Sequence, residues 1–263
     1  MTDKIIAATD ISYSYSGSIV LDRLSFDIYK GDFLAVIGRN GVGKSTLLKI
    51  INRVISGYKG AIDIYDRQHN SYSAKELARI IAYVPQQFNS EQPFTVKEFI
   101  EMSSYPYSSL CGGYRFYSSE IENAVAITEI QDLMTRNIAT LSGGERQTVL
   151  IAAAIAQNTP VIMLDEPTSY LDPTHVDHIC KILRNLNSKF QKTIVLITHD
   201  INLATLYSGR IIAMLSGAIV YDGDPQEIMN NMLLNRIYGK EFLFTNHPVS
   251  NAKIILPDLV LND

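Results

Sequence analysis

Residues 38–46 read GRNGVGKST, and this stretch decides how the surrounding chain folds. It fits the pattern G-x-x-x-x-G-K-[ST], with Lys44 and Ser45 in the required places. Upstream, residues 33–37 form a continuous apolar run, which is typical of a strand buried on both faces of a parallel sheet. Downstream, apolar residues recur at helical spacing at Leu47, Leu48, Ile50 and Ile51. The stretch therefore joins a buried strand to a helix.

A loop of this composition is suited to holding phosphate groups. Its glycines let backbone N–H groups converge on phosphate oxygens, and the helix N-terminus adds a favourable field for an anion. We expect Lys44 to neutralise charge on the β- and γ-phosphates and Ser45 to hold Mg²⁺. A tight turn without a ligand is the competing interpretation. The sequence predicts that ATP or a similar triphosphate contacts the whole loop: Gly38, Arg39, Asn40, Gly41, Val42, Gly43, Lys44, Ser45 and Thr46.

Length and composition limit the classes of protein that are possible. The chain has 263 residues, 46% of them hydrophobic, which is enough for a large core in one domain or two small ones. A net charge of −4 without a Lys/Arg-rich run argues against a nucleic-acid partner. No signal segment or 18-residue apolar run is found, so we expect membrane contact only through a partner. Cys111 and Cys180 are widely separated, as expected of free thiols in a reducing cytoplasm.

The patterns along the chain predict an α/β protein with an insertion. Two alternating stretches before the loop, within residues 5–30, predict an antiparallel pair. Helical patterns dominate from about residue 86 to 160, with a Ser/Tyr/Gly-rich connection in their midst. The expected strands lie at residues 61–65, 80–84, 161–164, 193–198, 211–215 and 218–221, with two more in 242–256. The expected helical segments lie at residues 74–81, 96–102, 121–133, 175–186 and 228–238.

We therefore expect a P-loop NTPase core with a mostly parallel sheet, an N-terminal antiparallel β part and an inserted helical subdomain. The main domain would cover residues 1–240, with the helical subdomain at about residues 87–159. Residues 241–263 would form a short C-terminal β tail. No internal repeat is present, because the phosphate loop occurs once.

Aromatic residues at two places allow two interpretations each. Tyr15 ends the first alternating stretch and could stack on a nucleotide base, or it could form a cross-strand aromatic pair. A second group lies in the connection at residues 103–119 and could dock a partner helix or cover the subdomain's own core. That group comprises Tyr105, Tyr107, Tyr114, Phe116 and Tyr117.

Polar residues follow three of the predicted buried strands. They are the phosphate loop, the pair Asp165 and Glu166, and His199. Ligands of open α/β sheets bind at the carboxyl ends of the strands, so we expect these groups to converge. Asp165 could orient the water shell of Mg²⁺. Glu166, pointing the other way because side chains alternate along a strand, could accept a proton from an attacking water, and His199 could bind the γ-phosphate or position that water.

Residues 141–147, LSGGERQ, open a predicted helix. Ser142 and Glu145 satisfy a capping box, and good capping is a sufficient reason for both. Capping does not explain Gly143 and Gly144, since two glycines at a helix start cost stability unless the backbone approaches something closely. A second phosphate contact is the natural candidate.

With these motifs in order, the sequence resembles the ATP-binding cassette family over essentially its whole length. The matches are GRNGVGKS as Walker A, Gln86 after Val84-Pro85 as the Q-loop, LSGGERQ as the family signature, VIMLDE as Walker B, residues 169–172 as the D-loop and His199 as the switch histidine. Similar chains commonly carry Arg where this one has Thr148 and Ala153, which leaves open how the signature helix is braced.

The resemblance implies a head-to-tail dimer of two copies. ATP would lie between Walker A of one copy and Ser142, Gly143 and Gly144 of the other. Tyr15 matches the adenine-stacking aromatic of the family. Gln86 would sense the γ-phosphate and Mg²⁺ and link them to the helical subdomain, so the implied metal-binding residues are Ser45, Gln86 and Asp165, and the implied catalytic residues are Glu166, His199, Lys44 and Gln86.

The leading hypothesis is an ATPase subunit of a membrane importer, bound to integral permease subunits at the cytoplasmic face of the membrane and served indirectly by a substrate-binding protein. The tail and the 105–119 connection look like those of ATPases for iron chelate, haem or cobalamin uptake. One alternative is a soluble cassette ATPase that acts on ribosomes, DNA or iron–sulfur assembly. Another is a regulatory module that uses nucleotide only to dimerise, against which Glu166 argues because binding alone needs no base.

Overall fold

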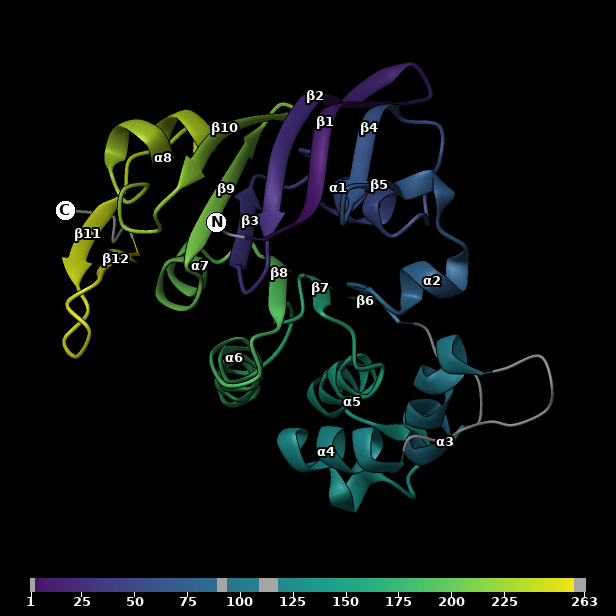
Figure 1. The fold of residues 1–263 in the computed structure, drawn as a ribbon. Helices are drawn as coiled ribbons and strands as arrows, with labels where there is room; N and C mark the ends of the chain where they lie inside the picture. The colour runs from purple at the N-terminus through teal and green to yellow at the C-terminus, as the bar shows by residue number, and fades with distance from the viewer. Residues whose placement is uncertain (1–2, 89–93, 109–117, 258–263) are drawn as a thin grey trace. The chain divides into compact units, whose positions relative to one another are not determined.

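The structure is a computed structural model that describes residues 3–88, 94–108 and 118–257. The chain divides into two compact units (Figure 1): Met1–His69 with Val195–Asp263, and Asn70–Ile194. Strand β8 (Thr193–Ile197) ends the second unit and continues into the first. The predicted 87–159 subdomain and 241–263 tail are narrower divisions than these two units, and as domain boundaries they stay predictions.

An antiparallel sheet forms the N-terminal part of the first unit. Its strand order is β2-β1-β4-β5, with bounds β1 (Lys4–Tyr15), β2 (Ser18–Tyr29), β4 (Lys59–Ile64) and β5 (Arg67–Gln68). Apolar residues of the alternating stretches, such as Ile11, Leu24 and Ile28, are buried. Ser16 and Gly17, both with positive φ, make the two-residue turn between β1 and β2. The predicted antiparallel pair is confirmed and is extended by two further strands.

The parallel strands of the first unit flank the phosphate loop. Strand β3 (Phe33–Gly38) pairs in parallel with β9 (Arg210–Leu215), and β10 (Ala218–Gly223) adds to β9 as the predicted hairpin. On the other side of β3 lies β8, where the Thr198 N–H donates to the Val36 carbonyl at 3.3 Å. All six residues of β3 are buried, which explains its unbroken apolar sequence.

Among its described residues, this unit has three α-helices: α1 (Lys44–Ile51), α7 (Ile201–Tyr207) and α8 (Asn231–Tyr238). The amphipathic segment predicted from residue 228 becomes helical only at Asn231, because Asn230 caps the helix while Ile228 and Met229 enter the core ahead of it. The predicted terminal pair is confirmed as β11 (Leu243–Asn246) and β12 (Lys253–Leu256).

The second unit is mainly helical and contains two parallel strands, β6 (Ile81–Val84) and β7 (Val161–Asp165). Its α-helices are α2 (Ala74–Ala78), α3 (Val96–Glu101), α4 (Ser118–Thr128), α5 (Gly143–Ala156) and α6 (Pro173–Ser188). Its 3-10 turns are η2 (Met102–Tyr107), η3 (Gln131–Leu133) and η4 (Ile138–Thr140), and η1 (His69–Ser71) spans the boundary between the units.

Two predictions for this unit need correction. The helix predicted over residues 121–133 ends at Thr128, because Glu129 has a φ of 58°, and Gln131–Leu133 is a separate 3-10 turn. The start of the 103–119 connection is not a loop but the 3-10 helix η2. Within it Tyr105 is exposed, whereas Tyr107 donates a hydrogen bond to the Gln157 carbonyl. The other aromatic residues of that group and Cys111 lie outside the described residues.

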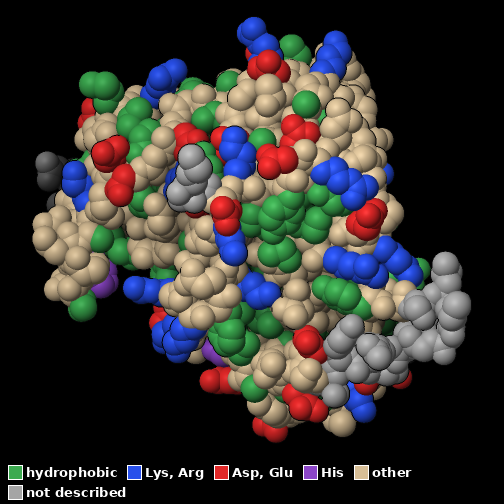
Figure 2. All heavy atoms as spheres, viewed as in Figure 1, with side chains coloured by type: hydrophobic (Ala, Val, Ile, Leu, Met, Phe, Trp, Pro, Cys, Tyr) green, Lys and Arg blue, Asp and Glu red, His purple; other side chains and the backbone are tan. Residues whose placement is uncertain are grey.

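The surface of the protein carries charges of both signs (Figure 2). On the face drawn in Figure 2, Lys and Arg side chains are interspersed with Asp and Glu. Among the residues that the structure describes, none of the helices has the length and apolar character to cross a bilayer. Cys180 is buried on α6.

Candidate active site

The glycines of the phosphate loop have backbone conformations that suit glycine alone. Gly38 has a φ of 145°, and a Cβ there would lie 2.5 Å from the Met214 carbonyl oxygen of β9. Gly43 has a φ of 102°, and a Cβ there would lie 2.8 Å from the Val20 carbonyl oxygen of β2. Strands on both sides therefore pack against the ends of the loop and hold its shape. Gly41, with a φ of 82°, has open space around it, so its N–H lies in a part of the loop that a ligand can approach.

Lys44 begins α1 and turns its ammonium group back into the loop. The side chain is only 4% exposed, and Nζ donates hydrogen bonds to the carbonyls of Gly38 at 2.8 Å and Arg39 at 3.0 Å. A buried ammonium needs such partners, because its desolvation is otherwise costly. The loop thus holds a positive charge at its centre, where the sequence predicted that phosphate would bind.

His199 and Tyr15 belong to the same unit as the phosphate loop. His199 follows β8, the neighbour of β3, so the two strands that carry His199 and the loop end side by side. Asp200 then caps α7 by accepting a hydrogen bond from the Leu203 N–H. Tyr15 is 70% exposed at the turn between β1 and β2, and β2 packs on Gly43 through Val20. The exposed ring favours the base-stacking interpretation over a cross-strand pair.

The two carboxylates after β7 belong to the second unit and differ in environment. Asp165 is 1% exposed and accepts a hydrogen bond from the Tyr83 hydroxyl at 3.3 Å. Burial, with this carboxylate beside it, raises the pKa of Tyr83. Glu166 has a φ of 49°, so the strand ends before it. Strand alternation is therefore not what sets the direction of Glu166, because its left-handed conformation does so, and the two carboxylates contact different groups.

Gln86 and Glu166, both predicted to be catalytic, are in direct contact. Nε2 of Gln86 donates to Oε2 of Glu166 at 2.9 Å, and the Ser169 hydroxyl donates to the same oxygen at 3.0 Å. The Ser169 N–H also donates to the Glu166 carbonyl, which closes a turn around the carboxylate. The structure thus brings together the Q-loop, the end of Walker B and the D-loop, and it adds a contact of Ser169 with Glu166 that the D-loop assignment did not predict.

The signature helix α5 is capped as predicted. The Glu145 N–H donates to the Ser142 hydroxyl, and the Ser142 N–H donates to the Glu145 carboxylate at 2.8 Å. That backbone hydrogen bond, supported by the 2.7 Å ion pair with Arg136, lowers the pKa of Glu145. Ionised Glu145 therefore stabilises the start of α5.

The two signature glycines have different surroundings. A Cβ at Gly143 would meet nothing closer than Leu171 at 4.0 Å, so Gly143 has room for a ligand. A Cβ at Gly144 would collide with the ring of His175 in the same chain. The argument that both glycines require a phosphate is therefore corrected for Gly144, because packing within the chain already requires glycine there.

The two positions where similar chains commonly carry Arg are filled differently. Thr148 is buried, and its hydroxyl donates to the Gly144 carbonyl at 2.9 Å. Ala153 lies on the wall of a pocket of about 390 Å³ next to the Q-loop. The Thr148 hydrogen bond lies within α5 itself, so it does not brace the helix against another element, and Ala153 leaves space.

The donors proposed for Mg²⁺ are chemically suitable. A hydroxyl from Ser45, a carboxylate from Asp165 and an amide oxygen from Gln86 are hard oxygen ligands. Mg²⁺ usually takes one or two protein carboxylates together with substrate phosphates, and the buried Asp165 offers one. In the described parts of the chain, no cluster of three or more His, Cys, Asp and Glu side chains could hold a metal without substrate.

Tyr238 is a neighbour of the phosphate loop that no sequence pattern indicated. It ends α8 and packs against the core that contains Ile37, with its ring 5.8 Å from that of Phe242. Burial raises its pKa to about 12, whereas the nearby Gly38 N–H acts in the opposite direction. The hydroxyl has no hydrogen bond of good geometry to any described residue. Only the tertiary fold brings α8 to this position.

An α/β fold with a phosphate loop, a buried lysine and a capped signature helix defines a nucleotide-binding ATPase of the P-loop class. A family model described as "ABC transporter" matches residues 21–169. The chain belongs to the ATP-binding cassette family, as the sequence motifs indicated, and it binds and hydrolyses ATP as the ATPase of an ABC transporter.

Relatives of known role align over nearly the whole chain. A petrobactin import ATP-binding protein of Bacillus anthracis is 33% identical over 97% of this chain and 93% of its own. A ferric enterobactin transport ATP-binding protein of Escherichia coli is 33% identical over 98% of this chain and 96% of its own. A hemin import ATP-binding protein of Thermobifida fusca is 33% identical over 96% of this chain and 88% of its own.

Solved structures agree on the fold. An inward-facing metal-chelate type ABC transporter has a TM-score of 0.83 at 26% identity, covering 97% of this chain and 98% of that one. A dimeric ATP-binding cassette bound to ADP and Pi has a TM-score of 0.74 at 29% identity, covering 84% of this chain and 99% of that one. The predicted fold class is therefore confirmed.

We expect Tyr238→Phe to unfold at the same temperature as the parent or slightly above it. A buried hydroxyl without a partner stabilises nothing, and its removal avoids a desolvation cost of about 1 kcal/mol. Tyr238→Ala should unfold several degrees lower, because loss of a packed aromatic ring costs roughly 3 kcal/mol. Differential scanning calorimetry of both variants tests this, and a large loss in Tyr238→Phe would contradict it.

Proposed function

We propose that this chain is the ATPase subunit of an importer for iron chelates or haem. The observation that carries the proposal is full-length similarity to import ATPases whose names specify petrobactin, ferric enterobactin and hemin. The chain would lie at the cytoplasmic face of the membrane, bound to integral permease subunits that receive cargo from a substrate-binding protein. Cobalamin remains a third possible cargo from the sequence pattern.

In this proposal two copies form a head-to-tail dimer around ATP. The phosphate loop of one copy binds the triphosphate, and Lys44 holds its β- and γ-phosphates. Ser142, Gly143 and Gly144 of the other copy close on the γ-phosphate, and Tyr15 stacks on the adenine. ATP favours the closed dimer, so its binding shifts the population toward closure and hydrolysis reverses the shift.

Hydrolysis needs a base and a positioned water. Glu166 would accept the proton of the attacking water, and its hydrogen bonds from Gln86 and Ser169 keep the carboxylate oriented. His199 would bind the γ-phosphate or position the water. Bound Mg²⁺ supplies electrostatic stabilisation of the phosphate charge, and Ser45, Asp165 and Gln86 would hold it.

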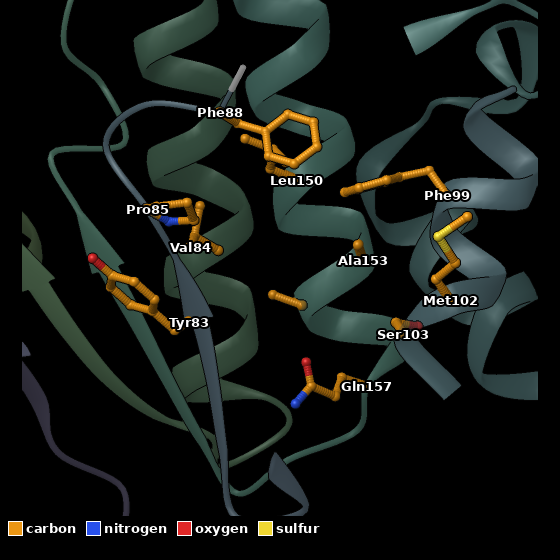
Figure 3. A pocket seen from close by; sticks show the side chains of 11 residues that line it. Tyr83, Val84, Pro85, Phe88, Phe99, Met102, Ser103, Leu150, Ala153 and Gln157 are labelled. Atoms are coloured by element: carbon orange, nitrogen blue, oxygen red, sulfur yellow. The ribbon is translucent and has the colours of Figure 1, made fainter. Parts of the chain in front are cut away.

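The pocket beside the Q-loop is the proposed docking place for the permease. Its residues come from β6, the Q-loop, α3, η2 and α5, and none of the described lining side chains is charged (Figure 3): Tyr83, Val84, Pro85, Phe88, Phe99, Met102, Ser103, Leu150, Ala153, Ala154 and Gln157. In Figure 3, Phe99 and Met102 face α5 across the pocket. Because Val84 and Pro85 lead directly into Gln86, an occupant of the pocket would contact the segment that carries Gln86.

Glu166→Gln should bind ATP but hydrolyse it at least about 100-fold more slowly, because an amide cannot act as a base. It should also accumulate ATP-bound dimers, measured by sedimentation. The control is Lys44→Ala, which should lose both nucleotide affinity and dimers, since the central charge of the loop is gone. Near-normal turnover in Glu166→Gln would remove Glu166 from the base role.

Ala153→Glu should weaken coupling to the permease. The charged side chain would enter an apolar pocket and displace its occupant, so stimulation of ATP hydrolysis by the permease should fall by about tenfold. ATP hydrolysis by the isolated chain should stay within about twofold of the parent. Ala126→Glu, on an exposed position of α4, is the matched control and should leave coupling intact. Equal coupling in both variants would contradict docking at this pocket.

The cargo is tested by reconstitution. The chain is purified with its membrane subunits, placed in liposomes and assayed for ATP hydrolysis with a ferric siderophore, haem or cobalamin and the matching binding protein. We expect stimulation by an iron chelate or by haem. Purification with ribosomes or DNA, and without membrane subunits, would instead favour a soluble cassette ATPase.

A further inference from the structure

Asp172 and His175 form a closed hydrogen-bonded pair at the start of α6. The Asp172 carboxylate caps the helix, because its Oδ1 accepts from the N–H groups of Thr174 at 2.9 Å and His175 at 3.2 Å. Its Oδ2 lies 2.6 Å from Nδ1 of the His175 ring. This ring contact holds the pKa of Asp172 below its usual range. Since an ionised carboxylate only accepts hydrogen bonds, Nδ1 carries the proton and the orientation of the ring is fixed.

The opposite edge of the same ring lies against the signature loop, as we call residues 141–144 at the start of α5. A Cβ at Gly144 would lie 2.6 Å from Nε2 of His175 and would also collide with Cδ2. These contacts are far inside van der Waals distance, so the ring fills the space that any side chain at residue 144 would need. The His175 side chain is 36% exposed, which distinguishes it from a core residue whose burial alone explains its presence.

The pair therefore connects two loops that are distant in sequence but belong to one unit. Asp172 ends the D-loop, and Gly144 lies in the signature loop. Gly143 and Gly144 are the first two residues of α5, where the helix itself offers the N–H groups no i−4 carbonyl, so these N–H groups can serve a ligand. Their placement depends on what holds the backbone at Gly144, and His175 is the side chain in closest contact there.

We propose that His175 is a positioning residue that ties the D-loop to the signature loop and thereby places the Gly143 and Gly144 amides for the nucleotide of a second copy. The inference rests on the proposed head-to-tail dimer. A hydrogen bond at one ring edge and close packing at the other prevent the ring from moving independently of either loop. A displacement of the D-loop is thus transmitted to the signature loop through an imidazole ring.

The test compares three substitutions of His175 in the Glu166→Gln chain, which we expect to accumulate dimers. His175→Ala removes both contacts, His175→Phe keeps a ring against Gly144 but cannot bond Asp172, and His175→Asn keeps a donor for Asp172 but shortens the side chain. The chain concentration at half-dimerisation in saturating ATP is measured by sedimentation. ADP affinity, which requires only the phosphate loop of one copy, is measured by calorimetry.

We expect His175→Ala to raise the half-dimerisation concentration by about tenfold or more, while ADP affinity stays within about twofold. His175→Phe and His175→Asn should lie between His175→Ala and the parent. Dimerisation like that of the parent, or an equal loss of ADP affinity in all three variants, would overturn the inference. A Glu166→Gln parent that never dimerises with ATP would overturn the dimer proposal itself, so the two failures are distinguishable.

Gly144→Ala provides an independent measurement. This change and His175→Ala break the same contact, so their effects on dimerisation should be non-additive, with the double variant about as impaired as the worse single variant. Fully additive losses would show that the two residues act separately and would overturn the inference. Circular dichroism of each variant establishes that the fold is retained.

Discussion

The buried ammonium group of Lys44 is the constraint on which the phosphate loop depends. A charge that is 4% exposed must be solvated by the protein, and the carbonyls of Gly38 and Arg39 do so. The loop curls tightly enough to present them because Gly38 and Gly43 adopt positive φ values. These glycines are in turn held by the backbones of β9 and β2. The sheets of the first unit are therefore built against a loop whose central charge attracts phosphate.

In the second unit, a residue with a strained backbone, Glu166, positions a charged group of the site. Glu166 takes a left-handed conformation at the end of β7, which costs a residue other than glycine about 1 kcal/mol. The conformation places its carboxylate where Gln86 and Ser169 both donate to one oxygen. Asp165, only one residue earlier, remains buried against Tyr83. Adjacent acidic residues thus occupy different environments, as a metal-binding carboxylate and a base would require.

Most of the fold followed from local sequence, and the exceptions have identifiable physical causes. Buried strands such as β3 are apolar throughout, and capping boxes such as Ser142 to Glu145 mark helix starts, so both were predicted correctly. Helical periodicity did not reveal that Glu129 would break a helix, because the residue type does not specify a positive φ. The contact of Tyr238 with the phosphate loop depends on tertiary packing of α8, for which the local sequence carries no signal.

The signature glycines show why a motif alone cannot assign a role to each of its residues. Glycine is required wherever a backbone must approach another atom closely, and sequence does not reveal whether that atom belongs to a ligand or to the same chain. At Gly143 the space is open, whereas at Gly144 the His175 ring fills it. The two requirements are compatible, because a ring that packs on one side of the backbone leaves the N–H groups free on another. Packing within the chain then determines the position of the backbone that the nucleotide meets.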